Sequence, residues 1–451
     1  MTVLRVRGGR ALQGGVRVPG DKSISHRALI LGALARGVTR VRGWLAGGDT
    51  LATLAVVRAL GVSVETLPSR SGDGETLAVH GGALRAPGGP LDCANAGTTM
   101  RLMAGLLAGQ PFESVLDGSA QLRRRPMRRV VAPLQAMGAA ITDTDGRAPL
   151  HLQPARLYGI HYEMPVASAQ LKSALLLAGL HAEGETVVVQ PGPARDHTER
   201  MLRAMGADIQ VEGARPGGRE GRPAAWVAAS GSQVRLRPGA PLAPLDLDVP
   251  GDFSSAAFLI AAGVLAPGSD VVVEGVNLNP TRTGLLDVLA RMGAAVSVER
   301  IGEDGEPAGV VRAQPSALRA TAVGGDDVVR LIDEFPILAV AATQASGVTE
   351  VCDAAELRVK EVDRIAMLAG ELRRLGAQIE ERVDGFVIEG PTQLRGAAVD
   401  AHGDHRLAMS LAVAGLIAEG ETMVHGAECI ADSFPGFVER LWELGADVSY
   451  E

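Results

Sequence analysis

The apolar and polar positions of the chain predict two kinds of helix that alternate along its length. Helices of the first kind are apolar on nearly every side, which predicts that they are buried. They span residues 23–35, 98–108, 168–180, 254–265, 334–344 and 405–418. Helices of the second kind are amphipathic and close on a glycine, which tolerates a positive φ, before a short stretch typical of a strand. The closing glycines occupy an apolar-Gly-apolar step at Gly61, Gly138, Gly206, Gly293, Gly376 and Gly445.

Six copies of one helix-Gly-strand unit predict an α/β protein built from repeats. A repeated four-residue sequence divides these units into two groups. Val18-Pro19-Gly20-Asp21 recurs as Val249-Pro250-Gly251-Asp252, and each copy precedes a predicted buried helix. Three units lie between the copies and three follow the second copy. We therefore predict two similar three-repeat domains, residues 21–247 and residues 1–20 with 248–451, with chain crossings near Gly20 and Gly251.

Composition narrows the class of protein. The chain has 451 residues, of which 46% are hydrophobic and only 3% aromatic, so Ala, Val, Leu and Gly must fill its cores. The formal net charge of −8 argues against a general nucleic-acid binder. Three scattered cysteines, Cys93, Cys352 and Cys429, exclude a disulfide framework and a recognisable zinc site. They fit a reducing compartment, and without a signal-peptide pattern or an apolar run near 18 residues we expect a cytoplasmic protein.

The lysines are unusual because only three of the 44 basic residues are Lys. They are Lys22, Lys172 and Lys360, and all three fall near predicted helix starts. Lys carries a compact ammonium whose pKa can be tuned, which Arg cannot imitate. We expect a functional role for Lys22 and Lys360, whereas for Lys172 a purely structural pairing is an equal alternative.

Other candidate anion-binding residues also gather at helix starts, where unpaired N–H groups and the positive end of the dipole attract phosphate and carboxylate. In the first half they include Ser23, Arg27, Gly97, Arg125, Ser168, Gln170 and Arg195, and in the second half Arg364 and Arg406. The basic run at 123–129 is more typical of a solvated face, so within it only Arg125 is predicted to have a functional role. This run lacks the interleaved aromatic residues that stacking on nucleic acid needs.

Two further candidate residues are acids and differ from the anion-binding residues in their expected role. Asp333 and Glu361 lie among cationic anion-binding groups, where a carboxylate gains nothing as a phosphate ligand, and this indicates proton transfer. Each acid alone is also compatible with an ordinary helix cap. The candidate metal ligands follow no metal-binding spacing, so we expect neither a metal nor a cofactor; they are His26, His197, His402 and His405.

At these positions the chain resembles the 5-enolpyruvylshikimate-3-phosphate synthase family, the 3-phosphoshikimate 1-carboxyvinyltransferases. The matching segments span nearly the whole chain: Gly20-Asp21-Lys22-Ser23, Asn95-Ala96-Gly97-Thr98, Arg125-Pro126-Met127, Ser168-Ala169-Gln170-Leu171-Lys172, Leu357-Arg358-Val359-Lys360-Glu361 and Gly403-Asp404-His405-Arg406. Arg195-Asp196-His197-Thr198-Glu199 and Asn279-Pro280-Thr281-Arg282 are similar to the class II branch.

The resemblance implies an enolpyruvyltransferase fold, with two inside-out α/β domains of three βαβαββ repeats each. It implies transfer of the enolpyruvyl (carboxyvinyl) group of phosphoenolpyruvate to the 5-hydroxyl of shikimate 3-phosphate, with release of phosphate. This addition-elimination belongs to the shikimate pathway of aromatic amino-acid biosynthesis. The resemblance also implies that glyphosate inhibits the enzyme weakly and that the enzyme is a monomer.

The resemblance also carries site residues. Shikimate 3-phosphate would be held by Lys22, Ser23, Arg27, Ser168, Ala169, Gln170, Arg195, Asp333 and Lys360. Phosphoenolpyruvate would be held by Lys22, Gly97, Arg125, Gln170, Glu361, Arg364 and Arg406. We expect Asp333 to be the base, Glu361 the acid and Lys22 a proton carrier, with the roles of Glu361 and Lys22 interchangeable.

Two positions depart from the family pattern. Ala94 stands where a Gly usually precedes the Asn, and its methyl group is expected to crowd the phosphoenolpyruvate pocket. Asp432 stands where many members carry a substrate-binding Lys, and it is therefore assigned no role in binding. Two rival readings are a UDP-N-acetylglucosamine enolpyruvyltransferase, which has a Lys-Asn pair where this chain has Lys22-Ser23, and a non-catalytic anion-binding protein.

Overall fold

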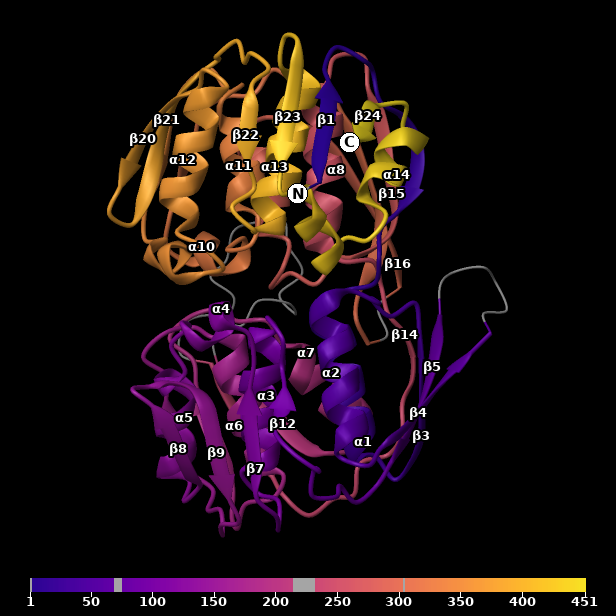
Figure 1. Cartoon of the computed structure of the whole chain (residues 1–451), viewed down its shortest axis with the longest axis vertical. Helices are drawn as coiled ribbons and strands as arrows, with labels where there is room; N and C mark the ends of the chain where they lie inside the picture. Colours follow the sequence, from indigo (N-terminus) through magenta and orange to yellow (C-terminus); the bar gives the residue numbers. More distant parts are fainter. Residues whose placement is uncertain (1, 69–74, 214–231, 303–304) are drawn as a thin grey trace. The chain divides into compact units, whose positions relative to one another are not determined.

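A computed structural model describes residues 2–68, 75–213, 232–302 and 305–451. The chain divides into two compact units, Gly20–Val249 and Met1–Pro19 with Pro250–Glu451, which we call the central unit and the terminal unit. In Figure 1 the central unit runs from indigo to magenta, and the terminal unit combines an indigo strand with orange and yellow segments.

The central unit contains three repeats of the order strand, helix, strand, helix, strand, strand. The first consists of β14 (Asp246–Asp248), α1 (Lys22–Leu34), β3 (Gly37–Arg42), α2 (Gly48–Ala59), β4 (Ser63–Leu67) and β5 (Thr76–Gly81). The second consists of β6 (Leu91–Asp92), α3 (Gly97–Leu107), β7 (Ser114–Asp117), the short α4 (Ala120–Arg123), α5 (Arg128–Ala136), β8 (Ala140–Thr144) and β9 (Arg147–Gln153). The third consists of β10 (His161–Glu163), α6 (Ala169–Gly179), β11 (Thr186–Val189), α7 (His197–Ala204), β12 (Asp208–Glu212) and β13 (Gln233–Arg237).

The terminal unit repeats this order three times. Its first repeat consists of β2 (Gln13–Arg17), α8 (Phe253–Leu265), β15 (Asp270–Asn277), α9 (Gly284–Arg291), β16 (Ala295–Gly302) and β17 (Ala308–Gln314). The second consists of β18 (Ala322–Val323), α10 (Asp326–Arg330), α11 (Phe335–Ala342), β19 (Gly347–Val351), the 3-10 helix η1 (Ala355–Val359), α12 (Arg364–Arg374), β20 (Gln378–Arg382) and β21 (Gly385–Gly390). The third consists of β22 (Ala398–Asp400), α13 (His405–Ile417), β23 (Glu421–His425), the 3-10 helix η2 (Ala427–Asp432), α14 (Phe437–Glu443), β24 (Asp447–Tyr450) and β1 (Val3–Arg7).

Each repeat forms one four-stranded sheet, and among the described residues all six sheets share one pairing pattern. The first strand pairs parallel with the second, and the remaining two pairs are antiparallel. In the β14-β3-β5-β4 sheet, for example, Val41 of β3 lies opposite Leu247 in the parallel pair and Leu77 in the antiparallel pair. This uniform pattern confirms the α/β repeat fold that the chain predicts.

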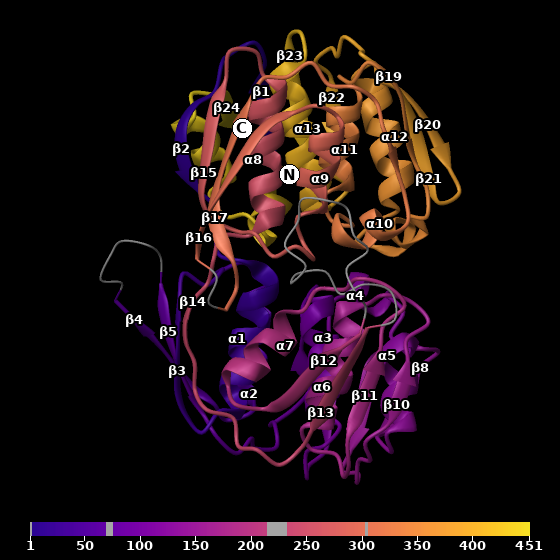
Figure 2. The same ribbon diagram turned by 180° about the vertical axis from the view of Figure 1, so that it is seen from behind.

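The apolar helix of each repeat packs inside its unit. In α8 every residue from Phe253 to Val264 is buried, and Figure 2 shows α8, α11 and α13 side by side in the terminal unit. In the central unit α3 and α6 approach so closely that a Cβ on Gly105 would lie 2.1 Å from the carbonyl oxygen of Ala174. Only glycine fits at this helix contact.

The predicted elements agree closely with the observed ones. The predicted buried helices at 23–35 and 405–418 are α1 and α13, whose ends differ by one residue. All six closing glycines have positive φ, between 83° and 98°, immediately after the C-caps of the amphipathic helices. The chain reverses at these glycines because a residue with a Cβ avoids this backbone conformation.

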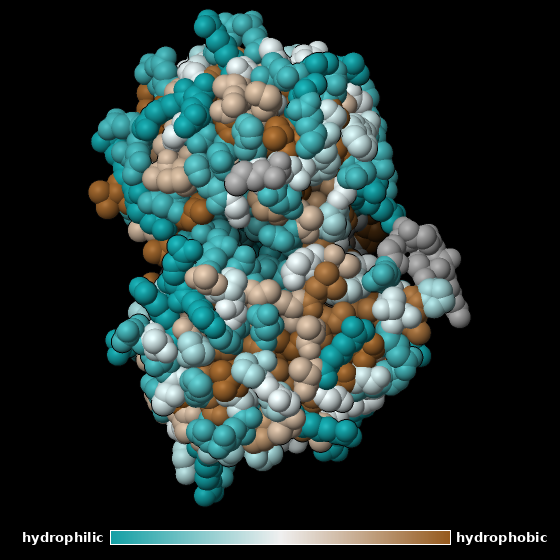
Figure 3. Space-filling view, in the orientation of Figure 1, coloured by the Kyte–Doolittle hydropathy of each residue, from teal (hydrophilic) through white to brown (hydrophobic). Residues whose placement is uncertain are grey.

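Hydrophilic residues cover much of the face seen in Figure 3, with hydrophobic residues scattered among them. Among the helices in the described ranges, none combines the length and apolar character that crossing a membrane requires.

Candidate active site

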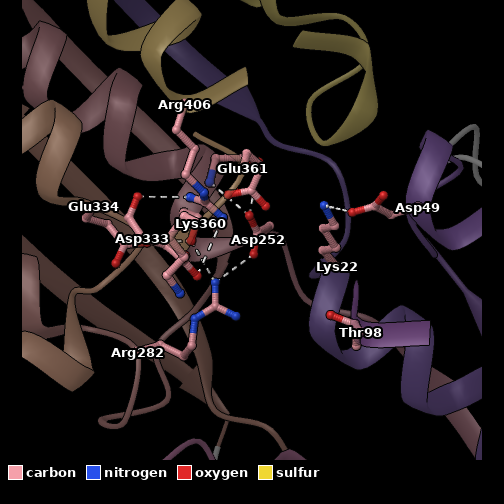
Figure 4. Close-up of polar contacts among 12 residues, drawn as sticks. Lys22, Asp49, Thr98, Asp252, Arg282, Asp333, Glu334, Lys360, Glu361 and Arg406 are labelled. Carbon is pink, nitrogen blue, oxygen red and sulfur yellow. Dashed lines mark hydrogen bonds and ion pairs between the residues drawn. The ribbon is translucent and has the colours of Figure 1, made fainter. Parts of the chain in front are cut away.

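In the central unit, Lys22 is the first residue of α1. The N-cap Asp21 accepts a hydrogen bond from the Ile24 N–H (3.0 Å), which fixes the start of the helix. The Lys22 ammonium forms an ion pair with the carboxylate of Asp49 in the first turn of α2 (Figure 4). Both side chains are partly exposed, so Lys22 is held in place while it stays accessible to a ligand. The sequence pattern alone does not indicate Asp49 as its partner.

Arg27 lies just over one turn further along α1 and connects three elements. Its Nε donates to Thr198 Oγ1 of α7 (2.7 Å), its Nη2 to Ser173 Oγ of α6 (2.8 Å) and its Nη1 to the Ser23 carbonyl (2.9 Å). A buried guanidinium needs such partners because desolvation is costly. Arg27 therefore holds α1, α6 and α7 in position relative to one another, and it lies next to Ser23.

Gln170 at the start of α6 forms hydrogen bonds with two residues of α3, and Gly97 is the first residue of α3. The Gln170 Oε1 accepts from Arg101 Nη1 (2.8 Å), and its Nε2 donates to Thr98 Oγ1 (2.9 Å). A Cβ on Gly97 would lie 3.0 Å from Arg125 Nη1 and 2.9 Å from Arg101 Nη1. The guanidinium of Arg125 thus lies directly against the N-terminus of α3, where an anion can contact both the N–H groups and the arginine.

The remaining predicted residues of the central unit also lie at helix starts. Ser168 is the N-cap of α6, accepting from the Leu171 N–H (3.4 Å), and Ala169 is the first residue of that helix. The half-buried Arg195 lies two residues before α7. Three other arginines of the basic run near Arg125 fit the predicted solvated face, because Arg123, Arg124 and Arg128 are exposed, whereas Arg129 is half-buried.

In the terminal unit, Asp333 lies between Arg364 and Arg406, of which Figure 4 labels Arg406. Its Oδ1 is 3.6 Å from Arg364 Nη1, and its Oδ2 is 3.6 Å from Arg406 Nη2. Arg406 also donates from Nη1 to the Asp333 carbonyl (3.2 Å). The three residues come from the segment before α11 and from the starts of α12 and α13, so three helix ends converge on one carboxylate.

Arg364 contacts two further carboxylates. Its Nη2 lies 2.6 Å from Glu361 Oε2, and its Nε lies 2.7 Å from Asp404 Oδ2. Burial disfavours the charged guanidinium, but the carboxylates of Asp404, Glu361 and Asp333 outweigh burial and raise the pKa of Arg364. Arg364 is therefore a permanent cation that holds both predicted proton-transfer acids.

Lys360 precedes Glu361 and is only partly buried. Its ammonium lies 3.6 Å from Glu356 in η1, an i,i+4 pair of modest strength. Figure 4 draws Lys360 beside Glu361 and Asp333. The predicted cation and the two predicted acids of the terminal unit therefore gather in one region of that unit.

The contacts of Lys172 distinguish between its two alternative roles. It is fully buried in α6, where its ammonium lies 2.5 Å from Glu199 Oε1 and donates to Gln190 Oε1 (2.8 Å). A lysine enclosed by these partners is not presented to a ligand. These contacts therefore favour the structural pairing over a role in ligand binding for this residue.

The two departures from the family pattern have different settings. Ala94 is exposed and has φ +48°, a conformation that a Gly would adopt at lower cost. Asp432 is the last residue of η2 in the terminal unit. Burial raises the pKa of the Cys429 thiol to about 12, and the negative charge of Asp432 contributes to this increase. Asp432 thus adds negative charge where many family members carry a cation.

Solved structures and known sequences resemble this chain. The enolpyruvyl transferase NikO from Streptomyces tendae has the same fold, with 22% identity, a TM-score of 0.79 and coverage of 100% of this chain and 99% of that one. The chain therefore has the enolpyruvyl transferase fold. The EPSP synthase from Acinetobacter baumannii matches more strongly, at 41% identity and a TM-score of 0.85 over 100% of both chains.

The sequence comparisons give the particular family. The model of EPSP synthase (3-phosphoshikimate 1-carboxyvinyltransferase) matches residues 6–441. A 3-phosphoshikimate 1-carboxyvinyltransferase of Citrifermentans bemidjiense is 51% identical over 97% of both chains, and one of Acidithiobacillus ferrooxidans is 50% identical over 99% of this chain and 98% of that one. The chain belongs to the EPSP synthase family. It is a transferase of the shikimate pathway, and membership supports enolpyruvyl transfer from phosphoenolpyruvate to shikimate 3-phosphate.

Proposed function

We propose that Asp333 and Glu361 move the protons in transfer of the enolpyruvyl group to the 5-hydroxyl of shikimate 3-phosphate. The observation that carries the proposal is the Arg364 guanidinium, which lies 3.6 Å from the Asp333 carboxylate and 2.6 Å from the Glu361 carboxylate. One cation thereby orients two acids. The shared contact with one buried cation holds the two carboxylates near each other, and this supports their proposed roles as base and acid.

The residues of the central unit are proposed as anion-binding groups. Lys22, Ser23, Arg27, Ser168, Ala169, Gln170 and Arg195 would contact shikimate 3-phosphate, with Asp333 and Lys360 from the terminal unit. The support is their place at the starts of α1 and α6 and before α7, together with the hydrogen bonds of Arg27 to Ser173 and Thr198. N–H groups at these helix starts and the nearby cations favour a phosphate.

Phosphoenolpyruvate is proposed to contact Lys22, Gly97, Arg125 and Gln170, and Glu361, Arg364 and Arg406 of the terminal unit. The arginine against the start of α3 and the two arginines around Asp333 supply charge for its phosphate and carboxylate. Arg406 follows the buried N-cap Asp404, whose Oδ1 accepts from the Arg406 N–H (2.8 Å). This cap fixes the backbone from which Arg406 projects.

The proton balance of the proposed reaction closes. Glu361, or Lys22 in its place, gives a proton to the methylene carbon of phosphoenolpyruvate while Asp333 takes the proton of the 5-hydroxyl. The hydroxyl oxygen bonds to the adjacent carbon and forms a tetrahedral adduct. Loss of a proton from the new methyl group back to the acid then expels phosphate and restores the double bond. The departing phosphate takes up the proton that Asp333 removed, so both the acid and the base return to their starting states. Lys22, Arg125, Arg364 and Arg406 offset the charge that develops.

A phosphate-release assay tests the function. We expect the purified protein to release phosphate only when shikimate 3-phosphate and phosphoenolpyruvate are both present. Omission of either substrate, or replacement of shikimate 3-phosphate by UDP-N-acetylglucosamine, should give no release. Binding of both compounds without release would favour the anion-binding alternative instead.

Three finer properties are part of the same proposal. The enzyme works in the cytoplasm, consistent with a chain whose cysteines Cys93, Cys352 and Cys429 are free thiols. It acts as a monomer. Glyphosate inhibits it weakly.

A further inference from the structure

A buried polar chain runs through the terminal unit beside Asp333. Glu334, the residue after Asp333, is the N-cap of α11, and its Oε1 accepts a hydrogen bond from the hydroxyl of Ser254 in α8. Arg282 Nη2 donates to the same hydroxyl oxygen (2.9 Å) and to Asp252 Oδ1 (2.9 Å). Figure 4 shows Asp252, Arg282, Asp333 and Glu334 together.

All four residues of the chain are almost completely enclosed. Relative exposure is 1% for Ser254, Arg282 and Glu334 and 3% for Asp252. Buried charged groups are tolerated only when they are paired and hydrogen-bonded, as these residues are. None of the four residues is assigned a contact with either substrate in the proposed mechanism.

The cluster is connected to rigid elements at both ends. Asp252 caps α8, accepting from the Ser255 N–H on Oδ2 (3.0 Å), while its Oδ1 accepts from Arg282. At the other end the Glu334 N–H donates to the Leu331 carbonyl (2.9 Å), and the Glu334 carbonyl accepts from the Leu338 N–H (2.9 Å). Both the backbone and the side chain of Glu334 are therefore held, and Asp333 is one peptide bond away.

We infer that Glu334 is a positioning residue for Asp333. Its carboxylate, held through Ser254 by the Arg282–Asp252 pair, fixes the backbone from which Asp333 extends between Arg364 and Arg406. This inference rests on the proposed role of Asp333 as the base. When the Ser254–Glu334 hydrogen bond is lost, the turn before α11 relaxes and the Asp333 carboxylate moves relative to the hydroxyl it deprotonates.

This positioning role predicts a split between turnover and binding. A displaced base slows the chemical step, and a displacement of about 1 Å can cost about 100-fold in rate. Asp333 is one of nine proposed contacts of shikimate 3-phosphate, and the Lys22, Arg27 and Arg125 contacts lie in the central unit, away from Glu334 in the chain. We therefore expect kcat to fall while KM for both substrates stays nearly constant.

The test compares Glu334→Ala, Glu334→Gln and Ser254→Ala with the wild type, using phosphate release by the full chain. We expect Glu334→Ala and Ser254→Ala each to lower kcat by about 10-fold or more, with both KM values within about 2-fold. Glu334→Gln should restore most of the turnover, because its amide oxygen still accepts from Ser254. The double variant Glu334→Ala/Ser254→Ala should be no slower than the slower single variant.

The controls separate this inference from the function on which it rests. Rates are normalised to folded protein by circular dichroism and thermal melting, and Glu389→Ala on the exposed part of β21 is the matched control. If the wild type releases no phosphate with both substrates, the proposed function fails. If wild type is active and Asp333→Ala is inactive, but Glu334→Ala keeps full kcat or Glu334→Gln loses as much as Glu334→Ala, the positioning role is wrong.

Discussion

Arg364 and Asp404 form a buried ion pair in the terminal unit, with Arg364 Nε 2.7 Å from Asp404 Oδ2. Asp404 is fully buried and also caps α13 through its other oxygen, which accepts from the Arg406 N–H (2.8 Å). One carboxylate thus fixes the side chain of one proposed phosphoenolpyruvate ligand and the backbone of another. The pair links the stability of the unit to the geometry of the proposed site.

Asp404→Asn should therefore impair binding as well as folding. The amide still accepts the Arg406 N–H bond, but Arg364 loses a buried counter-charge, and breaking such a pair costs about 3–5 kcal/mol. We expect a lower free energy of unfolding in urea and a KM for phosphoenolpyruvate raised by about 10-fold or more. An Asp404→Asn protein with wild-type stability and wild-type KM would show that the pair has neither role.

The Lys172–Glu199 pair should have a stabilising role only. Lys172→Met leaves the buried Glu199 carboxylate without its counter-charge, which should cost about 3–5 kcal/mol of unfolding free energy. Adding Glu199→Gln should recover part of that loss, because the uncompensated charge is then removed. Urea denaturation of the two single variants and the double variant measures the coupling, and strictly additive losses would argue against a direct pair.

Gly97→Ala should weaken binding of phosphoenolpyruvate selectively. The new methyl group would lie 3.0 Å from Arg125 Nη1 and 2.9 Å from Arg101 Nη1, so both guanidinium groups must shift. We expect KM for phosphoenolpyruvate to rise by about 10-fold, with a much smaller change for shikimate 3-phosphate. Gly88→Ala is the control, because a Cβ there meets nothing within 4 Å. Equal effects on the two substrates would contradict the proposed contact of Gly97.

His26 should make folding sensitive to pH. Burial lowers the pKa of His26 from 6.5 to about 3, and its Nδ1 shares a hydrogen bond with Thr53 Oγ1 (2.6 Å). The unfolded chain takes up this proton below pH 6.5 while the folded chain does not, so stability is lost as the pH falls. The loss is about 1.4 kcal/mol per pH unit, or about 2 kcal/mol between pH 7 and pH 5.

Urea unfolding of the wild type and of His26→Asn at pH 7 and pH 5 measures this contribution. The variant should lose less stability than the wild type over this interval, by about 2 kcal/mol. His161→Asn, at an exposed position of β10, should behave like the wild type. The same pH response in His26→Asn and the wild type would exclude a neutral buried imidazole.

The repeat architecture could be predicted because each of its signals is local. Gly61 and Gly445 end amphipathic helices by adopting a positive φ, and this requirement is visible in a few neighbouring residues. The buried helices could be predicted from their uniformly apolar composition. The ends of these helices are also where the candidate anion-binding residues lie, so much of the candidate site followed from the same analysis.

The partners of the site residues could not be predicted, because they are distant in sequence. Asp49 is 27 residues from Lys22, and Glu334 is 80 residues from Ser254. Lys172 illustrates the same difficulty: a helix start suggests an exposed cation, and only the fold shows that the side chain is turned toward Glu199. Local patterns identify which residue types lie at helix ends, but not which side chains they contact.

Turnover by Asp333→Asn tests the assignment of the base most sharply, because the change keeps the size of the side chain and removes the base. With shikimate 3-phosphate binding confirmed by calorimetry, we expect kcat for phosphate release to fall by about 100-fold or more. Turnover near the wild-type rate with intact substrate binding would contradict this assignment.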